Sequence, residues 1–390
     1  MISVDEALAR LFALVSPLGN ETVPLISAAG RVLAADVAAR RDQPPFAASA
    51  MDGYAVKATE AGLHAQFKVI GESAAGHGFD GAVKAGQAVR IFTGAPVPEG
   101  ASHVVIQEDV ERRGDLITIV APQDQGDNIR PLGTDFRSGD AIAGPRRLSP
   151  EDVALLAAMN VAEVPVTRRP TVALISTGDE LVMPGERPRR DQIIASNTFG
   201  LHALLTRLGA EPRLLPIARD NRESLETTFW LAQGADLIVT IGGASVGDHD
   251  LVGDVAAAMG MERAFYKIAM RPGKPLMAGR MGNAVMVGLP GNPVSAMVCG
   301  HIFLAPMIHA MLGLGASRRP ALKARLTRPL GANGPREHYQ RAIVDQGKIT
   351  VFDRQDSSLL SLLSRANALA ISPPRAEAMP TGAEIDYIPL

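Results

Sequence analysis

The sequence predicts a multidomain α/β protein, and three observations support that prediction. The chain has 390 residues, which is too long for one ordinary hydrophobic core and favours two to four domains. Between residues 169 and 316, apolar β-type runs alternate with helical patterns, as is typical of a parallel sheet covered on both faces. Before that region, glycine-separated β-type runs lie between two helical segments, which predicts an inserted mostly-β module.

Composition places the chain among ordinary globular proteins. It is 46% hydrophobic and 21% charged, with a formal net charge of −2 and 4% aromatic residues. The near-neutral charge and the scarcity of stacking side chains argue against a nucleic-acid partner. The single cysteine, Cys299, excludes an internal disulfide and a cysteine-cluster metal site, and its apolar surroundings favour a packed core residue. The chain starts without a signal-peptide pattern, and we expect a cytoplasmic protein with no membrane span.

Two short helices are predicted on either side of the inserted module. Ser3 and Glu6 match a capping box, and apolar residues follow at helical spacing up to Phe12. A similar helix start occurs at Ser149, and a second set of apolar residues at helical spacing follows it. Between these segments lie four short β-type runs, at 67–70, 88–91, 103–106 and 116–120.

Four strands and four helices are predicted in the α/β region. The β-type runs are 171–175, 213–217, 237–241 and 284–287. Helices are expected to begin near Asn197, Asn221, Asp250 and Pro293. The last of these helices is apolar and runs to about Met311. After a short linker at 317–320, proline- and glycine-punctuated strands predict a small all-β domain.

The predicted parallel strands deliver polar side chains to one crevice, because ligands of such sheets bind beyond the carboxyl ends of the strands. The first strand is followed by Ser176, Asp179 and Glu180, and the second by Arg219 and Asp220. The alternative role for Ser176, Asp179 and Asp220 is to cap a turn or a helix, and a capping aspartate beside a ligand can do both.

The third strand is followed by the most informative loop of the chain. Gly242 and Gly243 let the backbone approach an anion closely, and Asp248 and Asp250 come soon after them. These acids would hold a cation against that anion, so the loop predicts a phosphate-plus-metal site. The alternative is an ordinary solvated acidic turn.

A basic segment follows the acidic loop. Lys267, Arg271 and Lys274 fall within eight residues, around a turn forced by Pro272 and Gly273. Next to an acidic, glycine-rich rim we interpret these cations as an oxyanion clamp, with a solvated basic surface as the alternative.

The loop before the long apolar helix is a second candidate anion site. Pro290, Asn292 and Pro293 lie at the start of that helix, where free N–H groups point outward. The two prolines stiffen the approach, so the loop is predicted to cradle a tetrahedral oxyanion.

The inserted module adds polar residues whose individual signals are weak. Asp52 stands among small apolar residues, and a tight turn at Asp52-Gly53 is its alternative interpretation. Thr93 lies in FTGAPVP, and Arg130 and Asp135 lie in NIRPLGTDF at a spacing of five.

Taken together, seven motifs resemble the molybdopterin molybdenumtransferase family, which includes MoeA and the gephyrin E domain. They stand in the family's order and cover most of residues 1–315: PPFAASAMDGYAV, FTGAPVP, STGDELV, SNTFGLHALLTRLG, DLIVTIGGASVGDHD, RPGKP and GLPGNPVSA. Beyond about Pro320 the resemblance rests on order and size.

The resemblance implies four domains and a dimer. The domains are a helical linker domain at 1–44 and 137–168, an inserted mostly-β domain at 45–136, a three-layer α/β domain of the molybdopterin-binding type at 169–316, and a small C-terminal β-barrel at 317–390. Family members are homodimers, in which the α/β domain of one chain faces the inserted domain of the other.

The family reaction takes adenylylated molybdopterin and molybdate, hydrolyses the phosphoanhydride, releases AMP and inserts molybdenum into the dithiolene. The resemblance implies a catalytic set of Asp52, Asp135, Glu180 and Asp250, and a Mg²⁺ site of Glu180, Asp220 and Asp250. It implies substrate binding by Thr93, Arg130, Ser176, Gly242, Gly243, Lys267, Arg271, Lys274, Pro290, Asn292 and Pro293. Arg271 replaces the lysine of many relatives, and family serines of the C-terminal domain match Ser357 or Ser358.

Two other functions stay open. The same fold would suit a non-catalytic carrier or scaffold for molybdopterin intermediates, but the intact acidic and basic sets favour the enzyme. Adenylylation, which a similar α/β domain performs in a related family, is disfavoured by the additional β domains. The expected partners are the small-molecule substrates, the upstream adenylylating protein and the downstream proteins that load molybdoenzymes.

Overall fold

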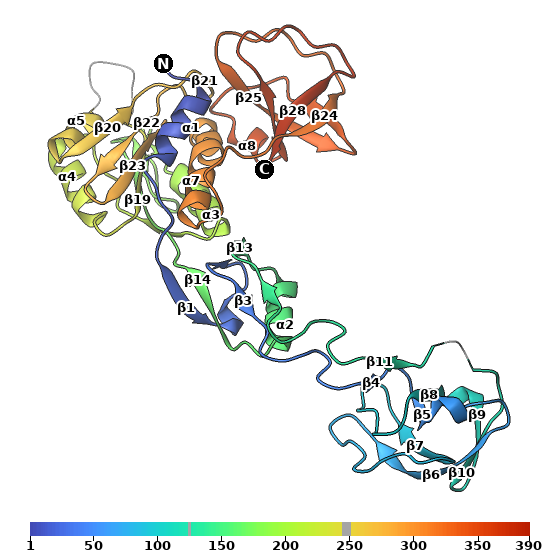
Figure 1. Cartoon of the computed structure of the whole chain (residues 1–390). Helices are drawn as coiled ribbons and strands as arrows, with labels where there is room; N and C mark the ends of the chain where they lie inside the picture. Colours follow the sequence, from blue (N-terminus) through green and yellow to red (C-terminus); the bar gives the residue numbers. More distant parts are fainter. Residues whose placement is uncertain (124–125, 244–250) are drawn as a thin grey trace.

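The computed structural model describes residues 1–123, 126–243 and 251–390 of the chain. The molecule is elongated and has four parts (Figure 1). The α/β domain and the C-terminal barrel lie side by side at one end, the inserted domain lies at the other end, and a small linker domain stands between them.

The linker domain is a four-stranded sheet covered by one helix. Its strands follow the order β1-β14-β2-β13, with bounds β1 (Asn20–Pro24), β2 (Val32–Leu33), β13 (Arg146–Arg147) and β14 (Glu163–Thr167). Helix α2 (Pro150–Ala158) begins at the predicted capping box, in which the Ser149 N–H donates to the Asp152 carboxylate at 2.9 Å. Leu33, Leu156 and Val164 are fully buried in the core between them.

The first predicted helix forms as α1 (Val4–Phe12), and the hydroxyl of Ser3 accepts the Glu6 N–H at its start. The sequence placed this segment in the linker domain, but Leu8 and Leu11 are buried in the main hydrophobic cluster of the α/β domain. The apolar face of a helix packs where the largest complementary surface lies, and here that surface includes α7 (Ala305–Met311). The linker domain consequently contains one helix and is largely β.

The inserted domain is built on a six-stranded sheet in the order β8-β5-β7-β6-β10-β9. Its strands are β5 (Gly53–Val56), β6 (Gln66–Ser73), β7 (Gln87–Ile91), β8 (His103–Ile106), β9 (Val110–Arg113) and β10 (Leu116–Ile119). Three of the four predicted runs fall within them, and the run at 116–120 extends one residue beyond β10. Gly53 is the first residue of β5 and pairs with Ile106, so it is not the corner of a tight turn. Glycine is needed at this position because a Cβ would lie 1.9 Å from the Val105 carbonyl oxygen.

Two short strand pairs connect the inserted domain to the linker. They are β3 (Val37–Ala38) with β12 (Ala141–Ile142), and β4 (Ala48–Ser49) with β11 (Ile129–Arg130). Both pairs are antiparallel, so the chain leaves and returns along the same path.

The α/β domain contains the four predicted strands in one six-stranded sheet of order β18-β15-β19-β23-β22-β20. The parallel strands are β15 (Thr171–Ser176), β18 (Glu211–Leu214), β19 (Leu237–Ile241) and β23 (Ala284–Leu289). Antiparallel strands β20 (Met261–Phe265) and β22 (Met277–Met281) extend the sheet beyond β23. The sheet is therefore mixed, whereas the alternating pattern predicted a parallel one.

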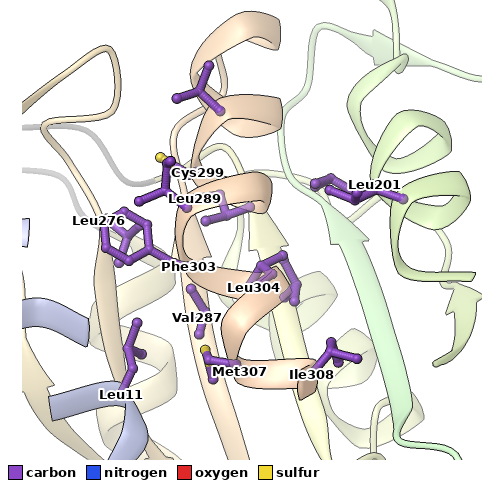
Figure 2. Close-up of a cluster of buried hydrophobic side chains, with 14 of the residues drawn as sticks. Leu11, Leu201, Leu276, Val287, Leu289, Cys299, Phe303, Leu304, Met307 and Ile308 are labelled. Carbon is purple, nitrogen blue, oxygen red and sulfur yellow. The ribbon is translucent and has the colours of Figure 1, made fainter. Parts of the chain in front are cut away.

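Helices cover both faces of this sheet, as predicted (Figure 1). Their bounds are α3 (Asn197–Arg207), α4 (Arg222–Leu231), α5 (Leu251–Ala258) and α6 (Pro293–Cys299), the last continuing through a π-helical turn, 300–304, into α7. The segment Pro293–Met311 is long and apolar enough to cross a membrane, yet 89% of its apolar window is buried inside the structure. Figure 2 shows it packed against the sheet, with Phe303, Leu304 and Met307 in the centre of the cluster.

The C-terminal domain is the predicted small barrel. Its strands are β24 (Leu322–Leu326), β25 (Glu337–Asp345), β26 (Lys348–Val351), β27 (Ala368–Ser372) and β28 (Glu384–Pro389), with the one-turn helix α8 (Leu360–Leu363) before β27. The barrel closes because β25 pairs with both β26 and β27. A two-residue strand of the α/β domain, β21 (Met270–Arg271), pairs with β25 and joins the two domains.

Candidate functional site

A cavity of about 1040 Å³ lies beyond the carboxyl ends of β15, β19 and β23. Parallel strands carry their ligands at this edge of a sheet, so the location is the one that the sequence predicts. Eight of the predicted site residues line it: Ser176, Glu180, Asp220, Gly242, Gly243, Pro290, Asn292 and Pro293.

Gly242 and Gly243 form part of the cavity wall, and a side chain at either position would clash with neighbouring atoms. Gly242 has φ +100°, and a Cβ on it would lie 2.6 Å from the carbonyl oxygen of Thr177. Gly243 has φ +66°, and its Cβ would lie 2.3 Å from a methyl group of Val252. Both positions therefore require glycine, because the left-handed backbone packs closely on Thr177 and Val252 at this part of the cavity lining.

The loops that carry Glu180 and Asp220 are tied together by Arg219. Its Nη1 donates to the carbonyl oxygens of Gly178 at 3.4 Å, Asp179 at 3.1 Å and Leu181 at 3.1 Å. In return, the Asp179 carboxylate accepts the Asp220 N–H at 3.2 Å. Asp179 and Arg219 are not among the lining residues, but their hydrogen bonds hold together the backbone segments that carry Glu180 and Asp220.

Asp220 is not the helix cap that the sequence left open as its alternative role. The N-cap of α4 is Asn221, whose side chain accepts the Ser224 N–H at 2.9 Å. Asp220 lines the cavity and is free to contact a ligand.

The oxygen donors of the cavity resemble a partial cation site. Glu180 and Asp220 both line it, and the Thr177 hydroxyl, also in the lining, is buried with no hydrogen-bond partner among the described residues. No cluster of three or more His, Cys, Asp or Glu side chains suited to a metal occurs in the described ranges. Asp248 and Asp250, which the sequence predicts as the acids of this loop, lie outside the described residues.

Several lining residues escaped the sequence prediction. They are Ile193, Ser196, Asn197, Asp254 and Pro275, among others. Ile193 comes from a short parallel pair, β16 (Leu181–Val182) and β17 (Ile193–Ile194), at the rim. Ser358 is contributed by the C-terminal domain, and only the family serines pointed to it.

The three predicted cations lie outside the lining of the cavity. Arg271 is in β21 beside the barrel, and Lys267 stacks on the Tyr266 ring at 5.1 Å from its centroid. Pro275, which follows Lys274, does reach the lining. The seam at β21 is electropositive: burial, and then the nearby Arg271, Arg341 and Arg336, lower the pKa of His338 to about 4.

In the inserted domain, the structure brings Asp52 and Thr93 into direct contact. The Asp52 carboxylate accepts the Thr93 N–H at 2.7 Å and the Thr93 hydroxyl at 2.8 Å. These two bonds, from backbone and then side chain, lower the pKa of Asp52, and the charge of Arg90 adds to the effect. Arg90 is held over the rings of Tyr54 and Phe92, at 5.2 and 4.7 Å from their centroids.

Arg130 and Asp135 lie on the segment that returns from this domain to the linker. Arg130 is in β11, opposite Ala48, and the Asp135 N–H donates to the Gln43 carbonyl at 2.9 Å. Both side chains are exposed. Within one chain, this set and the α/β cavity are at opposite ends of the molecule (Figure 1).

Comparison with known proteins gives matches along nearly the whole chain. Family models match residues 2–160 (MoeA N-terminal region, domains I and II), 173–310 (probable molybdopterin binding domain) and 323–390 (MoeA C-terminal region, domain IV). A molybdopterin molybdenumtransferase of Haemophilus influenzae is 36% identical over 381 residues, covering 95% of this chain and 94% of its own. The Synechococcus elongatus protein of that name is 32% identical over 407 residues, covering 99% of both.

A solved structure agrees with these matches. The molybdopterin biosynthesis MoeA protein from Pyrococcus horikosii superposes with a TM-score of 0.85 at 30% identity, over 99% of this chain and 98% of its own. Fold and cavity thus define a multidomain protein with an α/β domain of the molybdopterin-binding type. The chain belongs to the molybdopterin molybdenumtransferase (MoeA) family.

Replacing Arg219 with Gln should loosen the loop that carries Glu180, because three carbonyl oxygens lose their shared donor. We expect hydrogen–deuterium exchange of residues 178–182 to accelerate at least about tenfold, as for one lost hydrogen bond to a charged group. Arg213→Gln is the matched control, since that exposed arginine donates to a single carbonyl, of Gln233. Equal exchange in wild type and Arg219→Gln would show that Arg219 does not restrain the loop.

Replacing Thr93 with Val should raise the pKa of Asp52, because the carboxylate loses its hydroxyl donor and keeps only the backbone one. The folded-state pKa of Asp52 is depressed, so these bonds stabilise the fold above the unfolded pKa, and that contribution disappears as pH falls through the folded pKa. A carboxyl ¹³C NMR titration measures the shift, with Thr118→Val as control. An unchanged pKa of Asp52 in Thr93→Val would show that the Thr93 hydroxyl does not lower it.

Proposed function

We propose that this chain inserts molybdenum from molybdate into adenylylated molybdopterin, with hydrolysis of the phosphoanhydride and release of AMP. One observation carries the proposal. In a chain of this family, a cavity of about 1040 Å³ combines the carboxylates of Glu180, Asp220 and Asp254 with the glycine backbone at Gly242 and Gly243 and a proline-stiffened helix start. That combination suits a large substrate with anionic phosphates.

The phosphoanhydride would lie against the backbone of Gly242 and Gly243, which line the cavity. Pro290, Asn292 and Pro293 line it beside these glycines, and Ser176 lines it as well. Holding the phosphates against this rigid lining orients the bond to be broken, which is a recognised source of rate enhancement.

Glu180 and Asp220, joined by Asp250, would hold Mg²⁺. Mg²⁺ in phosphate sites is bound through one or two carboxylates together with water and the substrate, and Glu180 and Asp220 both line the cavity. When bound, the ion neutralises charge on the phosphate oxygens during cleavage. Arg219 and Asp179 keep the two carboxylates in place before the ion arrives.

Lys267, Arg271 and Lys274 would attract molybdate and neutralise its charge at the seam between the α/β domain and the barrel. The pKa of His338, beside Arg271, is lowered to about 4, so this histidine is neutral near pH 7. The charge of the seam therefore does not change through His338 near neutral pH, which fits this role.

The active unit in this proposal is a homodimer. Asp52, Thr93, Arg130 and Asp135 stand far from the cavity of their own chain, so they would complete the cavity of a second copy. The enzyme would work in the cytoplasm, between the protein that adenylylates molybdopterin and the proteins that load molybdoenzymes.

The decisive experiment supplies purified protein with adenylylated molybdopterin, molybdate and Mg²⁺. AMP release coupled to formation of active cofactor would establish the enzyme. Tight binding of the substrate with neither product would favour the alternative, a non-catalytic carrier or scaffold. ATP-dependent adenylylation of molybdopterin by the chain would replace both with the upstream activity.

Asp250→Ala should abolish molybdenum insertion while leaving the fold and substrate binding largely intact, because the proposed cation loses a carboxylate ligand. Asp248→Ala, two residues away in the same loop, is the matched control and should retain most activity. AMP release and cofactor formation are measured alongside substrate affinity. Full turnover in Asp250→Ala would remove this residue from the site.

A further inference from the structure

A second cavity, of about 630 Å³, lies beside the first and shares Ser196 and Asn197 with it. One wall is a single face of α3, formed by residues three or four positions apart: Asn197, Gly200, Ala203, Leu204 and Arg207. Gly200 makes room for the Met297 side chain, whose sulfur would lie 2.7 Å from a Cβ at that position, and the small side chain of Ala203 leaves the cavity open beside it. Helix geometry puts Arg207 ~15 Å along the axis from Asn197, so the cavity extends away from the first one.

The remaining walls are mainly apolar. Met297 comes from α6, and Leu360 and Leu363 come from α8 of the C-terminal domain. Methionine adapts its shape to different ligands, and the cavity volume falls in the range of about 300–1,000 Å³ that is usual for small-molecule sites.

One end of the cavity carries cations without acidic partners. Arg207 lines it, and Arg319 stands behind His301, donating to His301 Nδ1 at 3.3 Å and to the Pro389 carbonyl at 2.9 Å. Neither arginine is paired with a carboxylate of the described part of the chain. Burial, and then repulsion by the charge of Arg207, lowers the pKa of Arg319.

His301 contributes a further donor at this end. It lines the cavity, is 7% exposed, and burial followed by the charges of Arg319 and Arg207 lowers its pKa to about 4. The ring is therefore neutral near pH 7. A guanidinium can only donate, so Nδ1 accepts and the ring hydrogen is on Nε2.

We propose that this second cavity binds an amphipathic oxyanion, a small molecule with an apolar or flat body and one phosphate or carboxylate group. Its body would lie over Ala203 and Met297, and its anionic group would meet Arg207. A guanidinium fork matches such oxygens in a bidentate way, and the anion would relieve the repulsion between the arginines. The ligand would occupy a place separate from the proposed substrate site, next to it across Ser196 and Asn197.

The test uses the full chain and anilinonaphthalene sulfonate, a flat apolar probe with one oxyanion, followed by fluorescence titration. We expect one saturable site per chain. Arg207→Gln should weaken binding at least about tenfold, as expected for a lost charge-assisted hydrogen bond. Ala203→Trp, at an exposed helix position that fills the cavity, should abolish binding. Arg213→Gln, on β18 outside the cavity lining, is the charge-matched control and should bind as wild type does.

Competition then separates the two sources of such a ligand. Displacement of the probe by adenosine monophosphate would indicate a ring-bearing phosphate, and displacement by octanoate a chain carboxylate. Wild-type affinity in both Arg207→Gln and Ala203→Trp, or failure of both competitors at millimolar concentration, would overturn the assignment. Circular dichroism of each variant checks folding, and none of these readouts depends on molybdenum insertion.

Discussion

The structure depends on one hydrophobic cluster that joins parts of the chain far apart in sequence. The helix Pro293–Met311 fills its centre and packs against the sheet (Figure 2). Leu11 from the first helix, and Tyr339 and Leu369 from the barrel, belong to the same cluster. Close-packed interiors resist deformation, so the α/β domain and the barrel behave as one body. That is why Ser358 can line a cavity built mainly by strands of another domain.

Much of the fold could be predicted because local patterns report local structure. The caps at Ser3 and Ser149 and the β-type runs at 171–175 and 237–241 appear where the periodicity places them, whereas the run predicted at 213–217 forms at Glu211–Leu214. Periodicity shows which face of a helix is apolar but not which surface will cover it, and so the location of α1 was not predictable. Strand β22, with sequence MAGRM, lacks a β-type pattern and owes its place to pairing with β23.

The candidate site, like the fold, was predictable only where local sequence patterns and topology determine it. Residues at the ends of parallel strands converge by topology alone, and Glu180, Asp220, Gly242 and Pro290 do share a cavity. Arg219 was visible in the sequence only as a charge, whereas its role as a shared donor to three carbonyls needs the folded loop. Burial of the Thr177 hydroxyl, which has no hydrogen-bond partner in the described part of the chain, is likewise a tertiary property that no spacing encodes.

The inserted domain is held at a distance by a ribbon, and this bears on how its acids can act. Two segments run antiparallel from the linker, joined by the β3–β12 pair, by the bridge of Gln43 with Phe136 and by the β4–β11 pair. Paired segments resist bending more than a single strand, so the domain cannot readily fold back. Asp135 lies on this ribbon, and Asp52 just beyond it. A stiff arm that carries polar residues away from its own cavity is suited to serve the cavity of another chain, which is the physical support for the proposed homodimer.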